Sequence, residues 1–238
     1  MGRELPDPLP EFCPSCGAPF DIPHALKCKK GGWVVRRHDE VKDAWARLFK
    51  KACSHVTMEP YLPPCTGIKF AKASTSADPD ARADILARGL FTPLQDAYLD
   101  VAVIDTAADC RVGRLSPLAS LRGAEARKRA KYDERALLSG TFAPLVCSVY
   151  GTLAPEASKI MALVVNGLDS EDLEKRSTVA MQRVYLQTAI VKATSAGIRA
   201  RRRAQSHVAA PSPHHPEALD DCTVAVADSA PHRSSLAY

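Results

Sequence analysis

Three cysteines and one histidine near the start of the chain have the residue types and the spacing of a metal site. Cys13 and Cys16 form a C-x2-C pair, and His24 and Cys28 complete the pattern C-x2-C-x7-H-x3-C. Zn²⁺ is bound tetrahedrally by thiolate sulfur and imidazole nitrogen, and one tight turn lets both cysteines of a C-x2-C pair reach the same ion. We therefore expect a structural Zn²⁺ site, with His38 as the alternative to His24 for the fourth ligand.

The segment around and after the last of these cysteines is rich in positive charge. Positions 27 to 51 hold nine Lys or Arg against three Asp or Glu, although the net charge of the whole chain is only +5. Beside a metal site such a segment favours contact with nucleic-acid phosphates, and the alternative is a solvated helix face. The candidate phosphate contacts are Lys29, Lys30, Arg36 and Arg37.

Two aspartates lie within short apolar runs that have the character of strands. Asp100 lies within YLDVAVI, where alternation places it on one face with Ala102, and Asp84 lies between Ala83 and Ile85. A carboxylate in such a strand is costly unless it is paired, hydrogen-bonded or bound to a metal. Two such acids on neighbouring strands could share one Mg²⁺, which would activate water against a phosphodiester while a lysine balances the charge. The alternative is a solvated aspartate at each strand end.

Length and composition indicate a globular protein. The chain has 238 residues, of which 46% are hydrophobic, enough for a real core. No run approaches the length of a membrane span and the first residues lack a secretory signal, so we expect an intracellular, nuclear protein without membrane contact. Eight cysteines in a reducing compartment favour metal ligands and free thiols over disulfides.

Hydrophobic periodicity predicts helices that alternate with strands. This order favours an α/β fold in which a small mixed sheet is flanked by helices. From position 205 onward the composition predicts a disordered tail. The predicted helices cover 39–53, 119–139 with Gly140 at its C-terminal end, 155–165, and 170 to about 200 with Ser170 as its cap, and the predicted strands cover 83–87, 98–104 and 142–150.

Taken together, these stretches resemble the C-terminal part of non-LTR retrotransposon reverse transcriptases, over roughly residues 13–200. In that family a CCHC zinc knuckle precedes a restriction-like endonuclease of the PD-(D/E)xK fold. The resemblance implies an α-β-β-β-α-β core, with a zinc knuckle and basic linker over 1–37, the core over 38–168, a long C-terminal helix over 169–204 and a tail over 205–238. It is carried by the Cys/His pattern and by KKGGWVVRRHDEVKDAWA, ARADILARG, YLDVAVID, EARKRAKYDER and GTFAPLVCSVYGTLAPEAS.

The resemblance also implies a catalytic site. Asp84 falls on the aspartate of the family's PD motif, with Ala83 in place of the proline, and Asp100 falls on the acid of the third strand. Glu59 is a candidate for the additional acid that some members carry near the first helix. By this resemblance Asp84 and Asp100 would hold the catalytic Mg²⁺.

The lysine of the family's motif is missing, because its position holds Ala102. Lys128, or Lys131 one turn further, is expected to replace it from the following helix, where Glu125 shares the face. With either lysine in place, the resemblance implies a Mg²⁺-dependent endonuclease that cuts DNA, with RNA left open as a target and a reverse transcriptase domain outside this chain as a partner. Otherwise the chain is a non-catalytic nucleic-acid-binding relic of that domain or a zinc-stapled interaction domain.

Overall fold

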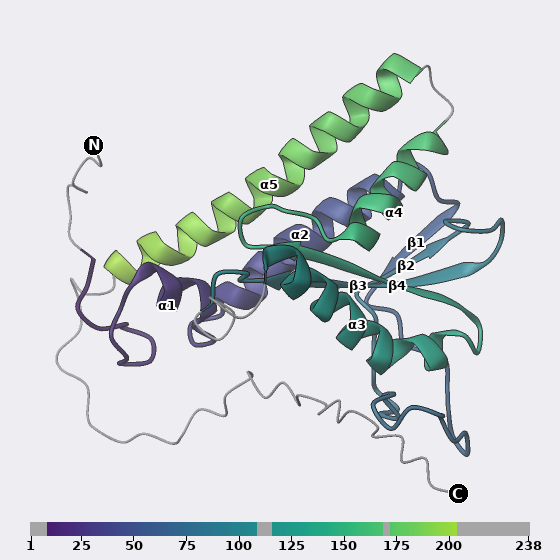
Figure 1. Cartoon of the computed structure of the whole chain (residues 1–238), viewed down its shortest axis with the longest axis horizontal. Coiled ribbons are helices and arrows are strands. Elements are labelled where there is room, and N and C mark those ends of the chain that lie inside the picture. The colour runs from purple at the N-terminus through teal and green to yellow at the C-terminus, as the bar shows by residue number, and fades with distance from the viewer. Residues whose placement is uncertain (1–8, 109–115, 169–171, 204–238) are drawn as a thin grey trace, which may run out of the picture.

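The computed structural model describes residues 9–108, 116–168 and 172–203, and in these it forms a four-stranded mixed sheet flanked by helices (Figure 1). The sheet order is β1-β2-β3-β4, in which β1 and β2 pair antiparallel, as do β2 and β3, and β3 pairs parallel with β4. The strands are β1 (His55–Met58), β2 (Ile85–Arg88), β3 (Asp96–Ile104) and β4 (Gly140–Ser148). The helices are α1 (Ile22–Lys27), α2 (Trp33–Phe49), α3 (Pro117–Ala136), α4 (Pro155–Asn166) and α5 (Asp172–Arg203).

This architecture confirms the predicted α/β class with a small mixed sheet, a Cys/His cluster near the N-terminus and a long C-terminal helix. Over the central part the elements follow the order α-β-β-β-α-β, from α2 to β4. Among the described helices, none combines the length and the apolar character needed to cross a membrane. The predicted cap Ser170 and the tail predicted from 205 lie outside the described residues.

The two faces of the sheet are covered by different helices. On β3, Leu99 and Val101 belong to the main core, which α2, α4 and α5 complete. Tyr98 and Ala102 point to the opposite face, where they pack with residues of α3. The alternation predicted for YLDVAVI is therefore observed, and Asp100 lies on the face covered by α3.

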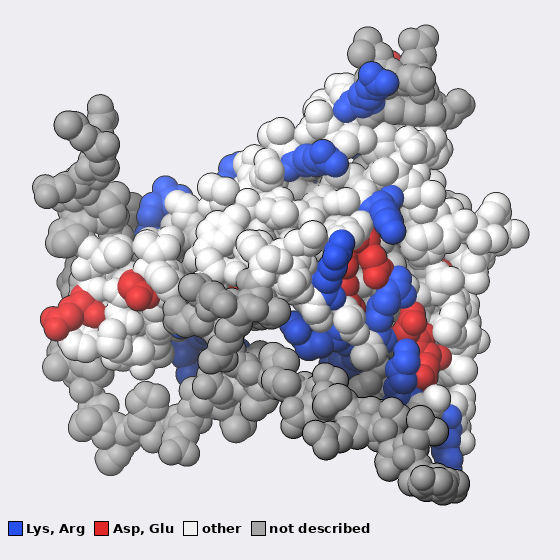
Figure 2. All heavy atoms as spheres, in the orientation of Figure 1, with Lys and Arg blue, Asp and Glu red and all other residues white. Residues whose placement is uncertain are grey.

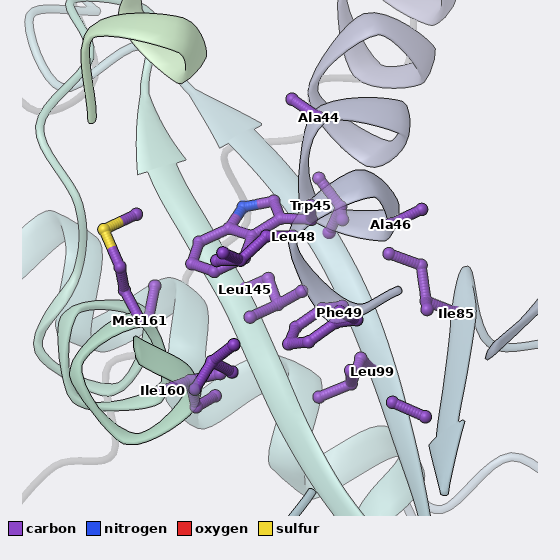
Figure 3. Close-up of a cluster of buried hydrophobic side chains, with 14 of the residues drawn as sticks. Ala44, Trp45, Ala46, Leu48, Phe49, Ile85, Leu99, Leu145, Ile160 and Met161 are labelled. Atoms are coloured by element: carbon purple, nitrogen blue, oxygen red, sulfur yellow. The ribbon is translucent and has the colours of Figure 1, made fainter. Parts of the chain in front are cut away.

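Two aromatic side chains of α2 anchor the main core. Trp45 and Phe49 are fully buried and stack with their ring centroids 5.7 Å apart (Figure 3). They face Leu99 of β3, Leu145 of β4 and Met161 of α4. Burial of a large apolar side chain is worth about 1.5–3 kcal/mol, so this stripe fixes α2 on the sheet.

The boundaries of α2 differ from the helix predicted over 39–53. The helix begins at Trp33, because Gly32 takes a left-handed conformation with φ of 72° and turns the chain into it, and it ends at Phe49. The boundary predicted between residues 37 and 38 therefore falls inside a helix. β1 was not predicted, because its four residues are too short for a clear alternation.

Gly140 does not end α3, as the sequence had suggested. The helix ends at Ala136, and Gly140 is the first residue of β4, opposite Asp96. A Cβ atom at this position would lie 2.2 Å from the backbone oxygen of Asp96. The glycine is needed because the two strands approach each other closely here.

Candidate metal centre and acidic site

The predicted metal ligands converge near the N-terminus. Cys13, Cys16, His24 and Cys28 each offer one ligand atom, and these atoms all lie within 4.8 Å of one another. The sulfur of Cys28 is 3.9 Å from that of Cys13 and 3.8 Å from that of Cys16, and Cys16 Sγ is 3.3 Å from His24 Nε2. A tetrahedral Zn²⁺ with usual bond lengths requires sulfur atoms about 3.8 Å apart and a sulfur-to-nitrogen distance of about 3.6 Å, so the cluster fits this ion.

Local backbone geometry explains why the ligands meet. After Cys13 the chain makes a tight turn in which the amide of Gly17 donates to the Cys13 carbonyl at 2.8 Å, and Gly17 takes φ of 76°. His24 and Cys28 lie four residues apart on α1 and at its C-terminal cap, so they share one side of a helical turn. Asp21 caps α1 by accepting a hydrogen bond from the amide of His24 at 2.6 Å.

The surroundings shift the pKa values of two of the thiols in opposite directions. Burial would raise the pKa of Cys13, but hydrogen bonds from the backbone of Ser15 and Cys16 outweigh it and lower that pKa. Burial raises the pKa of Cys16 to about 11. Metal binding would release the remaining thiol protons, because only thiolate is a strong ligand for Zn²⁺.

His38, considered above as an alternative zinc ligand, lies beside Asp84 and not in the Cys/His cluster. It lies on α2, and its Nε2 is 3.1 Å from Asp84 Oδ2 and 3.2 Å from the carbonyl oxygen of Val101. The fourth ligand of the Cys/His cluster is therefore His24. The hydrogen bond to Asp84 raises the pKa of His38 despite its burial.

Asp84 is held where β2 begins. It directly precedes β2, and its amide donates to the carbonyl of Leu99 at 3.0 Å. Its Oδ2 accepts a hydrogen bond from the amide of Val101 at 2.6 Å. The carboxylate therefore serves this β3 amide as its acceptor, in place of a backbone carbonyl. The regular β2–β3 pairing ends at Ile85 opposite Leu99, one residue after Asp84.

Asp100 and Lys128 form an ion pair on the α3 face of the sheet. Lys128 Nζ lies 2.5 Å from Asp100 Oδ2, and the Asp100 side chain is only 7% exposed. Burial raises the pKa of Asp100, the charge of Lys128 opposes this and the charge of Asp84 adds to it. Burial would lower the pKa of Lys128, but the charge and the hydrogen bond of Asp100, with the charges of Tyr132 and Asp84, together raise that pKa. Lys128 thus supplies positive charge to a buried carboxylate that a second acid repels.

The other predicted catalytic residues lie in different surroundings. Glu59 directly follows β1, and its amide donates to the Asp84 carbonyl at 2.9 Å, while its carboxylate accepts from Lys42 at 2.6 Å. Lys131 is exposed, and its ammonium lies 4.8 Å from the centroid of the Tyr132 ring. Glu125 is buried and accepts a hydrogen bond from the amide of Glu156 in the first turn of α4. Of the two candidate lysines, Lys128 is the one beside the acids.

The predicted phosphate contacts divide into exposed and buried residues. Lys29, Lys30 and Arg36 are exposed, and the Arg36 guanidinium carbon lies 5.4 Å from the centroid of the Trp33 ring. Arg37 is only 5% exposed and donates to the carbonyl of Leu26 at 2.9 Å. The assignment of Arg37 as a surface contact is wrong, because its guanidinium is used inside the protein.

Basic side chains near α3 do not form a patch of one sign. In Figure 2 blue and red side chains lie mixed over the region of α3. Arg129, for example, pairs with Glu156 at 2.5 Å and with Asp133 at 3.1 Å. The exposed Lys29 and Lys30 lie elsewhere, in the segment between α1 and α2.

Sequence reasoning missed the part of His38 and Arg37 in the structure. The two residues lie next to each other on α2, and each reaches a partner that is distant in the sequence or in another element. The histidine beside an acid in RRHDE was the available sequence signal that His38 could have a functional role. Nothing in the spacing indicated that its partner would be Asp84.

No protein-family model matches the sequence, and no curated protein matches it.

Proposed function

We propose that this chain is a metal-dependent DNA endonuclease of the restriction-like type that accompanies retroelement reverse transcriptases. The observation that carries the proposal is the group formed by Asp84, Asp100 and Lys128. Asp100 is buried on the α3 face of the sheet with Lys128 against it, and Asp84 lies near enough for its charge to raise the pKa of Asp100. Two carboxylates and a lysine are the kinds of groups that would serve phosphodiester hydrolysis with a hard cation.

The residues would divide the work as follows. Asp84 and Asp100 would hold Mg²⁺, which supplies an activated water and polarises the phosphate when it is bound. Asp84 is oriented for this by the amide of Val101, which fixes Oδ2 and leaves Oδ1 for another partner. Lys128 would turn from Asp100 toward the negative charge that develops on the phosphate, and its raised pKa keeps it protonated.

The Cys/His cluster and the basic segment would hold the nucleic acid. Lys29 and Lys30 directly follow the last ligand, and Arg36 lies on the first turn of α2, so their charges would lie beside the proposed zinc. Phosphate contacts of this kind are independent of sequence and weaken with salt. A target of DNA, with RNA as the alternative, a reverse transcriptase partner and a nuclear location all belong to this proposal.

A plasmid-nicking assay in Mg²⁺ tests the proposal. Supercoiled DNA should be converted to the open circle by the zinc-loaded protein, and Asp100→Ala or Asp84→Ala should abolish conversion while DNA affinity changes little. Asp105→Ala is a matched control, since Asp105 lies just beyond β3 and forms no part of the group. Cleavage that survives both substitutions, or that needs no divalent ion, would contradict the proposal.

A second candidate is a non-catalytic nucleic-acid-binding module, which Ala102 favours. The family's lysine position is alanine, and Lys128 already pairs with Asp100. DNA binding with the usual salt dependence, without nicking in Mg²⁺ or Mn²⁺, would support this candidate.

A further inference from the structure

The Cys/His cluster is not an independent module. It forms a small hydrophobic cluster of its own with Phe20 and Ala25, and Ile198 of α5 packs against that cluster. α5 also approaches the first residue of α2 closely, because a Cβ atom at Gly197 would lie 3.2 Å from the Trp33 side chain. The cluster, the start of α2 and the end of α5 are therefore packed together (Figure 1).

Arg37 of α2 donates a buried hydrogen bond to this region. Its guanidinium donates to the carbonyl of Leu26 at 2.9 Å. Leu26 lies on α1 between His24 and Cys28, so this carbonyl belongs to the helical turn that carries two ligands. A guanidinium buried without its acceptor would be costly, so the contact depends on α1 keeping its place.

His38, the next residue, makes the corresponding contact with the acidic site. Its Nε2 reaches both Asp84 Oδ2 and the carbonyl oxygen of Val101. Successive side chains of a helix point about 100° apart. Arg37 and His38 therefore contact different neighbours from the same turn of α2. One neighbour is the turn that carries the metal ligands, and the other is the carboxylate proposed to hold Mg²⁺.

We propose that Arg37 is a positioning residue that couples the Cys/His cluster to the acidic site, by fixing the first turns of α2 so that His38 holds Asp84. A test of this coupling by DNA cleavage rests on the proposed function, whereas the structural coupling between the two sites does not. The cluster thus has a second role besides holding nucleic acid. Cys13, Cys16, His24 and Cys28 would hold Zn²⁺ and with it keep α1 in place, and the Leu26 carbonyl on α1 accepts from Arg37 of the helix that presents His38 to Asp84.

The test compares Arg37→Met, which keeps the aliphatic length but removes the donors, with Arg37→Lys, which keeps one donor. For Arg37→Met we expect kcat for nicking to fall by about 10- to 100-fold, the range found when groups behind a metal ligand are removed. KM for DNA should change by less than about twofold, since the lost group contacts no phosphate. Arg37→Lys should recover part of kcat.

The ring signals of histidine in two-bond ¹H–¹⁵N NMR spectra of the full chain give a readout that needs no cleavage. His38→Asn identifies the His38 signal. Arg37→Met, and separately removal of Zn²⁺ by a chelator, should move that signal toward the position of an exposed histidine. If the wild-type protein does not nick DNA, the proposed function fails and this signal alone decides the coupling.

Two control variants on the same helix separate coupling from DNA contact. Val35→Ala, at a position that is 61% exposed, should leave kcat, KM and the His38 signal unchanged. Arg36→Ala should raise KM and lower the salt dependence while the His38 signal stays in place. If Arg37→Met behaves like Arg36→Ala, or leaves both kcat and the His38 signal unchanged, Arg37 does not couple the two sites.

Discussion

Replacement of Lys128 by methionine would remove the ammonium that lies 2.5 Å from Asp100. Loss of one partner from a fully buried ion pair costs about 3–5 kcal/mol, whereas an exposed pair is worth about 0–1 kcal/mol. Here Asp100 is 7% exposed and Lys128 is 31% exposed, so the pair lies nearer the buried limit. We expect the free energy of unfolding at pH 7 to fall by about 2–3 kcal/mol.

The same substitution should make stability depend on pH in a defined direction. The pKa of Asp100 is already raised in the folded protein, and without Lys128 it should rise further. An acid with a raised folded pKa destabilises the protein fully above that pKa and not at all below the unfolded value. The deficit of Lys128→Met relative to wild type should therefore shrink as the pH falls from 7 toward 4.

Urea unfolding of the zinc-loaded protein, followed by tryptophan fluorescence, measures both effects. Lys128→Met combined with Asp100→Asn should recover most of the loss, because no buried charge remains unpaired. Lys131→Met is the matched control, and it should cost only about 0.5 kcal/mol for the contact with Tyr132. Additive losses in the double variant, together with a deficit that does not change with pH, would refute the reasoning.

Three further predictions concern the supports of the two sites. Cys28→Ser should abolish tight binding of one Zn²⁺ per chain, measured by metal analysis, and chelation of the wild type should loosen the end of α5 as well as the cluster, seen by hydrogen exchange. Gly140→Ala should destabilise by about 1–3 kcal/mol because its Cβ would collide with β3, whereas Gly123→Ala on α3 should be neutral or stabilising by about 0.5 kcal/mol, both by urea unfolding. Arg135→Met should cost about 3 kcal/mol by the same method, since the buried guanidinium donates to carbonyls of the segment before β2, and an unchanged midpoint would contradict this.

The elements that could be predicted are those with a strong apolar period. The stripe on α2 and the alternation around Asp100 each repeat often enough to specify a buried face, and the spacing of the cysteines specified the metal cluster. β1 was missed, because a short strand is defined by its partner rather than by its own pattern.

Residues whose role depends on distant partners could not be predicted. Arg37 was counted as surface charge, because a sequence does not show that α1 folds back to place a carbonyl over it. His38 was considered for the wrong site, since its partner Asp84 is 46 residues away. Lys128 could be proposed, because alanine at position 102 leaves the family's lysine to be supplied from elsewhere and a lysine side chain of the following helix is long enough to reach an acid of the sheet.

The contact between Ile198 and the Cys/His cluster also has a consequence for biosynthesis. The last ligand, Cys28, is made about 170 residues before Ile198, which is roughly 10 to 30 s at ribosomal rates of 5–20 residues per second. During that interval the thiols lack the cover that α5 gives them. The nascent chain would therefore expose its cysteines to oxidants and to competing metals, and early capture of Zn²⁺ would protect them until synthesis reaches α5.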